Sequence, residues 1–70
     1  MSIGDFIKEE TRLPNYEIAK FLDSKSYNYS YIYRILNGKS QPTLCMFFNI
    51  CKDLGIDKVK IAQFYANYNK

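Results

Sequence analysis

Apolar residues recur at helical spacing in short segments along this chain, and each segment ends at a proline, a glycine or a polar stretch. Ile3, Phe6 and Ile7 form an i, i+3, i+4 stripe, which predicts a helix over 3–11 that stops before Leu13-Pro14. Similar stripes predict helices over about 15–22, 28–36 and 43–54, and a fifth that begins after Asp57. No segment alternates as a strand does, so the sequence predicts an all-α, compact five-helix bundle in one domain over 1–70.

The stripes also indicate which residues we expect to face the core of this bundle. Helix 4 is expected to bury five side chains and to end on Gly55, a residue suited to a helix C-terminus. The expected inward residues after the first helix are Ile18, Ala19, Leu22, Ile32, Ile35, Leu36, Leu44, Phe47, Phe48, Cys51, Leu54 and Ile61.

The segment 30–44 is the most informative part of the chain. In its helix, Ser30 and Arg34 fall on the stripe opposite the apolar one and give it a polar, basic face. Asn37-Gly38 suits a helix stop, and Pro42 suits the first turn of the next helix. A short helix with one apolar and one basic face, followed by a lysine-bearing turn, is well shaped to enter a DNA groove.

With Glu17-Ile18-Ala19 upstream and Leu54-Gly55-Ile56 downstream, this segment resembles the Cro/repressor-type helix-turn-helix family, also called the xenobiotic-response-element family. The resemblance covers roughly residues 3–66 and is densest over 30–56. It implies a lambda-repressor-like fold in which helices 2 and 3 form the helix-turn-helix. It also implies sequence-specific binding of double-stranded DNA by helix 3 in the major groove, as a small transcriptional regulator, with repression the expected outcome.

The resemblance assigns base contacts by position to three residues: Tyr29, Ser30 and Arg34. Arg34 is the strongest of them because arginine can donate two hydrogen bonds to guanine. Its alternative use is a surface salt bridge, for example with Glu17.

Phosphate contacts are expected from a second set: Asn15, Asn28, Tyr33, Asn37, Lys39 and Ser40. Asn15 matches a family position that binds phosphate and braces the recognition helix, although N-capping of helix 2 is an equally good use of it. Tyr33 could meet a phosphate, a sugar or a protein partner, and the sequence does not rank these three. Tyr31 is expected to be partly buried and Tyr27 to join the core.

One departure from the family pattern concerns the turn between helices 2 and 3. Asn37 stands 18 positions after Ala19, about three more than the family usually has. The glycine usual in that turn is also missing. Either the longer turn bulges harmlessly, or helix 3 points in a new direction relative to helix 2, which would put the role of Asn15 in doubt.

Composition adds a charge asymmetry to this picture. The net charge is +3, and the only charged residues from Ser24 to Lys52 are cations, while five of the seven acids precede Ser24. The basic residues therefore gather around the expected recognition helix, as a nucleic-acid interface requires, although a solvated surface explains them equally well on charge alone.

Several function classes are disfavoured by what the sequence lacks. The chain has no histidine, no glycine-rich phosphate loop and no recognisable catalytic carboxylate pair, so we expect no enzyme, no cofactor, no metal site and no small-molecule substrate. Cys45 and Cys51 lie six apart in one helix, too far for a disulfide, and are expected to be reduced residues that pack the helix. No apolar run approaches a membrane span and no signal-peptide pattern is present, so a cytoplasmic protein without a membrane partner is expected.

Two questions about partners stay open at this stage. The aromatic side chains of Phe64, Tyr65 and Tyr68 could form a homodimer interface, which would place two recognition helices on successive major grooves, or could only seal the bundle. The competing function is a protein-interaction module on the same scaffold, such as an antirepressor or a phage-type inhibitor, with exposed tyrosines as its anchors.

Overall fold

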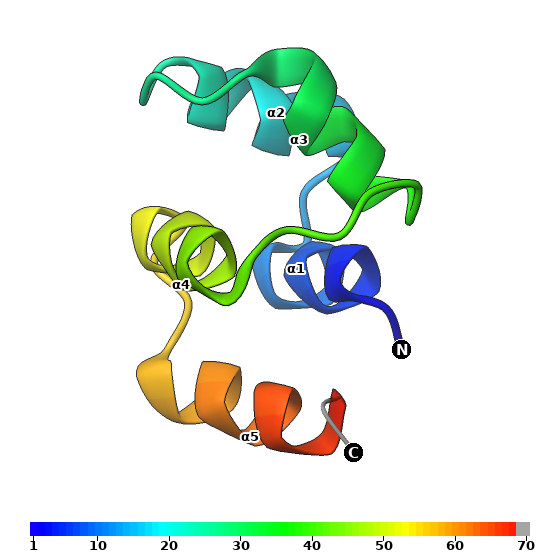
Figure 1. The fold of residues 1–70 in the computed structure, drawn as a ribbon. Coiled ribbons are helices and arrows are strands. Elements are labelled where there is room, and N and C mark those ends of the chain that lie inside the picture. The colour runs from blue at the N-terminus through cyan, green and yellow to red at the C-terminus, as the bar shows by residue number, and fades with distance from the viewer. Residues whose placement is uncertain (69–70) are drawn as a thin grey trace.

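The computed structural model describes residues 1–68 and folds them into five helices, with no strand in that range. The helices are α1 (Ile3–Thr11), α2 (Asn15–Asp23), α3 (Tyr29–Leu36), α4 (Leu44–Asp53) and α5 (Lys58–Tyr68) (Figure 1). The predicted all-α bundle is therefore confirmed, and each helix lies close to its predicted bounds.

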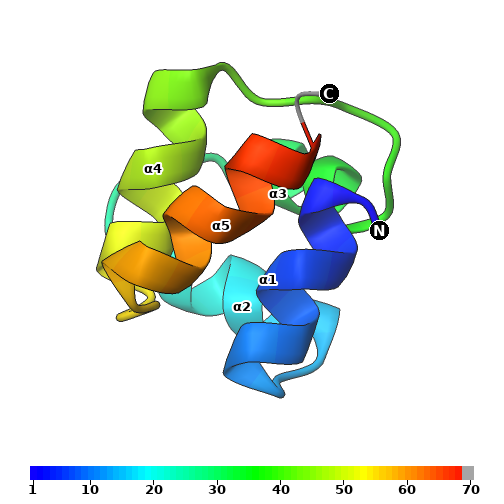
Figure 2. The same ribbon diagram turned by 90° about the horizontal axis from the view of Figure 1, so that it is seen from below.

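The helices form three layers in a body of 30 × 23 × 21 Å. Figure 1 shows α2 and α3 together in the upper layer, α1 and α4 in the middle and α5 below them. Viewed from below, α5 lies across both α1 and α4 (Figure 2). The layer that contains α3 and the layer that contains α5 are thus the two outer layers of the molecule.

Short polar residues start three of the helices. Ser2 and Asp5 form a reciprocal capping box at the start of α1, and this hydrogen bonding lowers the pKa of Asp5. Asn28 and Thr43 accept backbone N–H groups at the starts of α3 and α4. The expectation that Pro42 lies in the first turn of helix 4 is wrong, because Thr43 takes the cap position and leaves Pro42 outside the helix.

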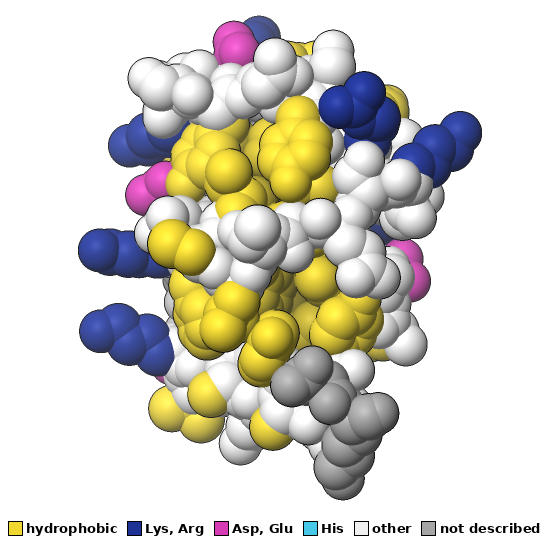
Figure 3. Space-filling model, in the orientation of Figure 1, with side chains coloured by type: hydrophobic (Ala, Val, Ile, Leu, Met, Phe, Trp, Pro, Cys, Tyr) yellow, Lys and Arg dark blue, Asp and Glu magenta, His cyan; other side chains and the backbone are white. Residues whose placement is uncertain are grey.

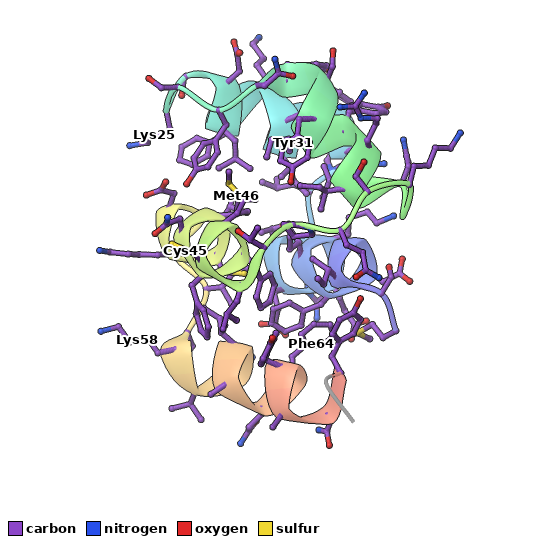
Figure 4. All side chains as sticks on the ribbon, in the orientation of Figure 1. Lys25, Tyr31, Cys45, Met46, Lys58 and Phe64 are labelled. Atoms are coloured by element: carbon purple, nitrogen blue, oxygen red, sulfur yellow. The ribbon has the colours of Figure 1, made fainter. Side chains whose placement is uncertain are left out.

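One apolar core joins the three layers. Its centre holds Phe47, which is 1% exposed and packs against the rings of Phe6, Phe48, Phe64 and Tyr65. The residues predicted to be inward on α1, α2 and α3 are all buried, as is Ile61. Tyr27 and Tyr31 are partly buried against the core, as predicted, and Figure 4 shows Tyr31 and Met46 between α3 and α4.

Helix α4 departs from its predicted pattern. Leu44 and Phe48 are 45% and 39% exposed, so their predicted burial is wrong, while Ile50 is fully buried. The buried stripe of α4 runs through residues 47, 50 and 51, which turns Phe48 to the edge of the core. Leu44 lies in the first turn, which Figure 2 shows projecting beyond α5. Cys51 packs in the core as predicted, but Cys45 is exposed and does not.

Helix α1 approaches the end of α3 closely because residue 4 is a glycine. A Cβ atom on Gly4 would lie 2.5 Å from the carbonyl oxygen of Leu36 and 2.7 Å from that of Ile35. Any larger residue would push the two helices apart. Gly4 therefore fixes α1 against the C-terminal end of α3, the helix on which the expected DNA contacts depend.

Candidate nucleic-acid interface

The outer face of α3 carries four side chains in two pairs, each one helical turn apart. Tyr29 and Tyr33 stack with ring centroids 5.8 Å apart and an interplanar angle of 26°. Ser30 and Arg34 form the second pair, and the four residues line one shallow surface depression. Ser30 and Arg34 are exposed, Tyr29 is 39% exposed, and Tyr33 is partly buried. The structure thus brings together the three residues expected at bases and one of those expected at phosphates.

Arg34 has no acidic partner within the described chain. The two salt bridges among residues 1–68 join Lys8 to Asp5 and Lys60 to Glu10, and neither involves Arg34 or Glu17. All five N–H donors of the Arg34 guanidinium are therefore available to a ligand. The alternative use of Arg34, a salt bridge with Glu17, finds no support in this arrangement.

The first turn of α3 is held by Asn28. Its side-chain oxygen accepts the N–H of Tyr31 at 2.9 Å, which makes Asn28 the N-cap of α3. This bond occupies the side-chain acceptor and leaves the amide NH₂ group of an exposed residue for other partners. A phosphate contact by Asn28 would therefore use that NH₂ group alone.

The C-terminal end of α3 is tied to the start of α2 through two asparagines. Asn15 donates from its amide nitrogen to the amide oxygen of Asn37 at 2.9 Å, across 22 positions of sequence. Pro14 is the N-cap of α2 and no side chain caps that helix, so the N-capping alternative for Asn15 is wrong. The NH₂ group of Asn37 remains a donor at this junction.

The turn after α3 presents Lys39 to solvent. Gly38 adopts φ +75°, a left-handed conformation that favours glycine, and the N–H of Lys39 then bonds to the carbonyl oxygen of Arg34. Lys39 is exposed and forms no salt bridge within residues 1–68. Ser40 is half-buried and lines a small crevice with residues of α1 and with Tyr68.

The turn between α2 and α3 packs back onto the core through Tyr27. Ser26 takes φ +76°, a left-handed conformation that favours glycine. Tyr27 then donates from its hydroxyl to Asp53 on α4 at 2.7 Å, which anchors the turn. Burial first, and this hydrogen bond second, raise the pKa of Tyr27 to about 12. Both ends of α3 are therefore attached to other helices, one through Tyr27 and the other through Asn37.

Basic side chains surround apolar surface on the face that Figure 3 shows. Dark-blue Lys and Arg side chains project near α3 and its following turn, and others project along the opposite edge of the same face. Lys25 belongs to that opposite edge (Figure 4) and lies 5.5 Å from the ring centroid of Phe21. Cations thus stand at two opposite edges of this face, with apolar surface between them.

The three aromatic residues expected at a dimer interface are half-buried on α5. Phe64 stacks on Phe6 at 4.3 Å between centroids, and Tyr68 stacks on Phe64 at 5.4 Å. Tyr65 packs on Phe47. This packing is what sealing the bundle requires, and it leaves only part of each ring for a second copy.

Tyr16 is an exposed aromatic residue outside the sets expected at bases and phosphates. It lies in the first turn of α2, beside Asn15, and is 57% exposed. Its position off the inward stripe of Ile18, Ala19 and Leu22 was a sequence signal that could have found it.

Within the described residues, no cluster of three or more metal-ligating side chains forms, and no helix has the length and apolar content to cross a membrane. Burial raises the pKa of the Cys51 thiol to about 12, so this thiol stays protonated at neutral pH and is a poor nucleophile.

Comparisons with protein-family models, with curated proteins and with solved structures find no match to this chain.

Proposed function

We propose that this protein binds double-stranded DNA through α3 and acts as a small transcriptional regulator. The observation that carries the proposal is the outer face of α3. There the exposed Arg34 guanidinium has no acidic partner among residues 1–68 and stands beside Ser30 and the stacked Tyr29 and Tyr33. An eight-residue helix is about 12 Å long, a length that fits within the major groove.

In this proposal, residues at the two ends of α3 contact phosphates and set the position of the helix on the DNA. Residues on its outer face contact bases and determine which DNA sequence is bound. Arg34 donates two hydrogen bonds to a guanine edge, and Tyr29 and Ser30 reach neighbouring bases. The amide groups of Asn15 and Asn37, together with the Lys39 ammonium, supply donors to phosphates where α3 ends. Asn28, Tyr33 and Ser40 complete the proposed phosphate contacts.

A homodimer is the form in which such a domain would reach high specificity. The longest dimension of the chain is 30 Å and it presents a single α3, whereas two half-sites on successive major grooves lie about 34 Å apart. Two copies are therefore needed to read both half-sites, and we propose the exposed parts of Phe64, Tyr65 and Tyr68 as their contact.

Selection of bound sequences from random duplex DNA tests the proposal, with affinity then measured against salt. Arg34→Ala should relax the preference at one base and cost about 1–3 kcal/mol of binding free energy. Lys39→Ala should weaken all sequences alike and reduce the salt slope by about one. Lys60→Ala is the matched control, since it removes the same charge from α5, where Lys60 pairs with Glu10.

Absence of duplex binding at low salt would refute the DNA-binding proposal. The protein-interaction module would then gain from one specific observation, the stacked pair of Tyr29 and Tyr33, because tyrosine rings are frequent anchors at protein interfaces. In that case Tyr29→Ala and Tyr33→Ala should release a protein partner that Arg34→Ala retains.

A further inference from the structure

An apolar groove of about 650 Å³ lies between α4 and α5. Phe48, Ile56 and Ile61 line it, and the proposed DNA interface uses none of these residues. Figure 1 shows α5 and α3 in the two outer layers, on opposite sides of α1 and α4. A ligand in the groove and a ligand on α3 can therefore bind at the same time.

The apolar surface extends beyond the groove along α4. Leu44 and Phe48 are one helical turn apart and are 45% and 39% exposed. On the face in Figure 3, hydrophobic side chains gather between α4 and α5. Apolar side chains scattered singly over a surface need no partner, but a row that continues a groove is typical of an interaction site.

The charge that the groove offers a partner is positive. Lys52 and Lys58 line it and form no salt bridge within residues 1–68, and Lys58 projects from the edge of the molecule (Figure 4). Asp57 also lines the groove, where its carboxylate accepts the N–H of Val59 at 3.1 Å, whereas Asp53 lies outside the lining and accepts the Tyr27 hydroxyl. The two lysines outnumber the single aspartate, so the lining is net positive. A complementary partner therefore combines apolar side chains with carboxylates.

We propose that the groove binds an acidic amphipathic helix of a partner protein. Apolar residues of that helix, spaced one turn apart, would pack against Phe48 and Leu44, while its acids would face Lys52 and Lys58. A helix fits better than a small amphiphilic anion, because the apolar surface continues from Phe48 in the groove to the exposed Leu44, beyond the reach of a small ligand. This proposal does not rest on DNA binding by α3.

Two synthetic peptides test the charge part of the proposal. Each is about 18 residues long, sufficient for a helix in water, with leucines one turn apart; one carries glutamates beside them and its twin carries lysines. Titration into ¹⁵N-labelled protein should shift the amide signals of Gly55 and Ala62 with the acidic peptide, and leave them in place with the basic twin.

Variants on α5 locate the site and control for folding. Ala62 and Ala66 are both exposed and one turn apart, but only Ala62 lines the groove. Ala62→Glu should weaken the acidic peptide roughly tenfold or more, as expected for a like charge in the contact, while Ala66→Glu should leave it unchanged. Lys52→Glu with Lys58→Glu should weaken the acidic peptide and give affinity for the basic twin. Ala62→Glu and Ala66→Glu add the same single negative charge, so any effect on DNA binding should be small and equal for the two.

Other occupants of the groove would overturn the proposal. Decanoate shifting the same amides while neither peptide does would assign the groove to a small amphiphile. A mass that rises with protein concentration in the native chain but not in Ala62→Glu would assign it to a second copy. Equal binding of both peptides would show that Lys52 and Lys58 do not select the partner. Binding of neither peptide nor decanoate would refute the proposal.

Discussion

The hydrogen bond between Asn15 and Asn37 should contribute both to the stability of the fold and to the proposed DNA binding. It is one neutral bond of 2.9 Å between a half-buried residue and an exposed one, and it closes 22 positions of chain. A neutral hydrogen bond contributes about 0.5–1.5 kcal/mol net, and the exposure of Asn37 places this one in the lower half of that range. We therefore expect a coupling free energy of roughly 0.5–1 kcal/mol between the two side chains.

A double-mutant cycle measures this coupling. Urea unfolding of the native chain, Asn15→Ala, Asn37→Ala and the double variant, followed by circular dichroism, gives the four free energies of unfolding. Asn15→Ala should also weaken duplex binding about equally for all sequences, because it removes a proposed phosphate donor and loosens α3 without touching a base. A coupling within error of zero would refute bracing of α3 by this bond. A change in sequence preference in Asn15→Ala would instead place this residue at a base.

Three further predictions concern the core, the turn and assembly. Phe47→Ala should cost about 3–5 kcal/mol of unfolding free energy in urea, since the ring is 1% exposed and touches other rings on several sides; a cost below about 1 kcal/mol would contradict its central place. The folded pKa of Tyr27, about 12, lies above its unfolded value of 10.0, so its protonated form adds stability that is complete below pH 10 and is lost as pH rises through 12. Tyr27→Phe should remove this loss from the alkaline unfolding profile. Tyr68→Glu should convert a homodimer to a monomer in sedimentation, whereas an unchanged mass with lower stability would show that the ring only seals the bundle.

The helix bounds and the polar face of α3 could be predicted because their signals are local. Ser2, Asn28 and Thr43 cap helices through bonds that span three residues, and the stripes on α1 to α3 repeat within single helices. Ser30 and Arg34 share the exposed face of α3 because residues four apart lie one turn apart in any α-helix. Each of these features depends only on residues within one helix or at its cap, so contacts with the rest of the chain are not needed to predict it.

Features that depend on two distant segments were beyond the sequence pattern. Helix α4 is apolar on more than one side, and only the packing of the other helices against it decides that Ile50 is buried while Leu44 is exposed. The bond of Tyr27 to Asp53 spans 26 positions, and the left-handed conformation of Ser26 has no residue-type signal. The groove between α4 and α5 also depends on how two helices pack together, whereas the sequence pattern predicts each helix separately.

The proposed interface carries few positive charges, and this limits the DNA affinity of a single copy. Arg34 and Lys39 are the cations on α3 and its following turn, and Lys25 lies in the turn before it. Because Arg34 is assigned to a base, Lys25 and Lys39 remain for phosphates. If each neutralised one phosphate, a single copy would show a salt slope of roughly −2, and two copies on adjacent half-sites roughly −4. So few phosphate contacts give one copy weak binding at physiological salt, and high affinity then requires a second copy or a partner. A steep slope combined with a monomer in sedimentation would show that cations outside α3 and its two turns contact DNA. The interface proposed on α3 would then be incomplete.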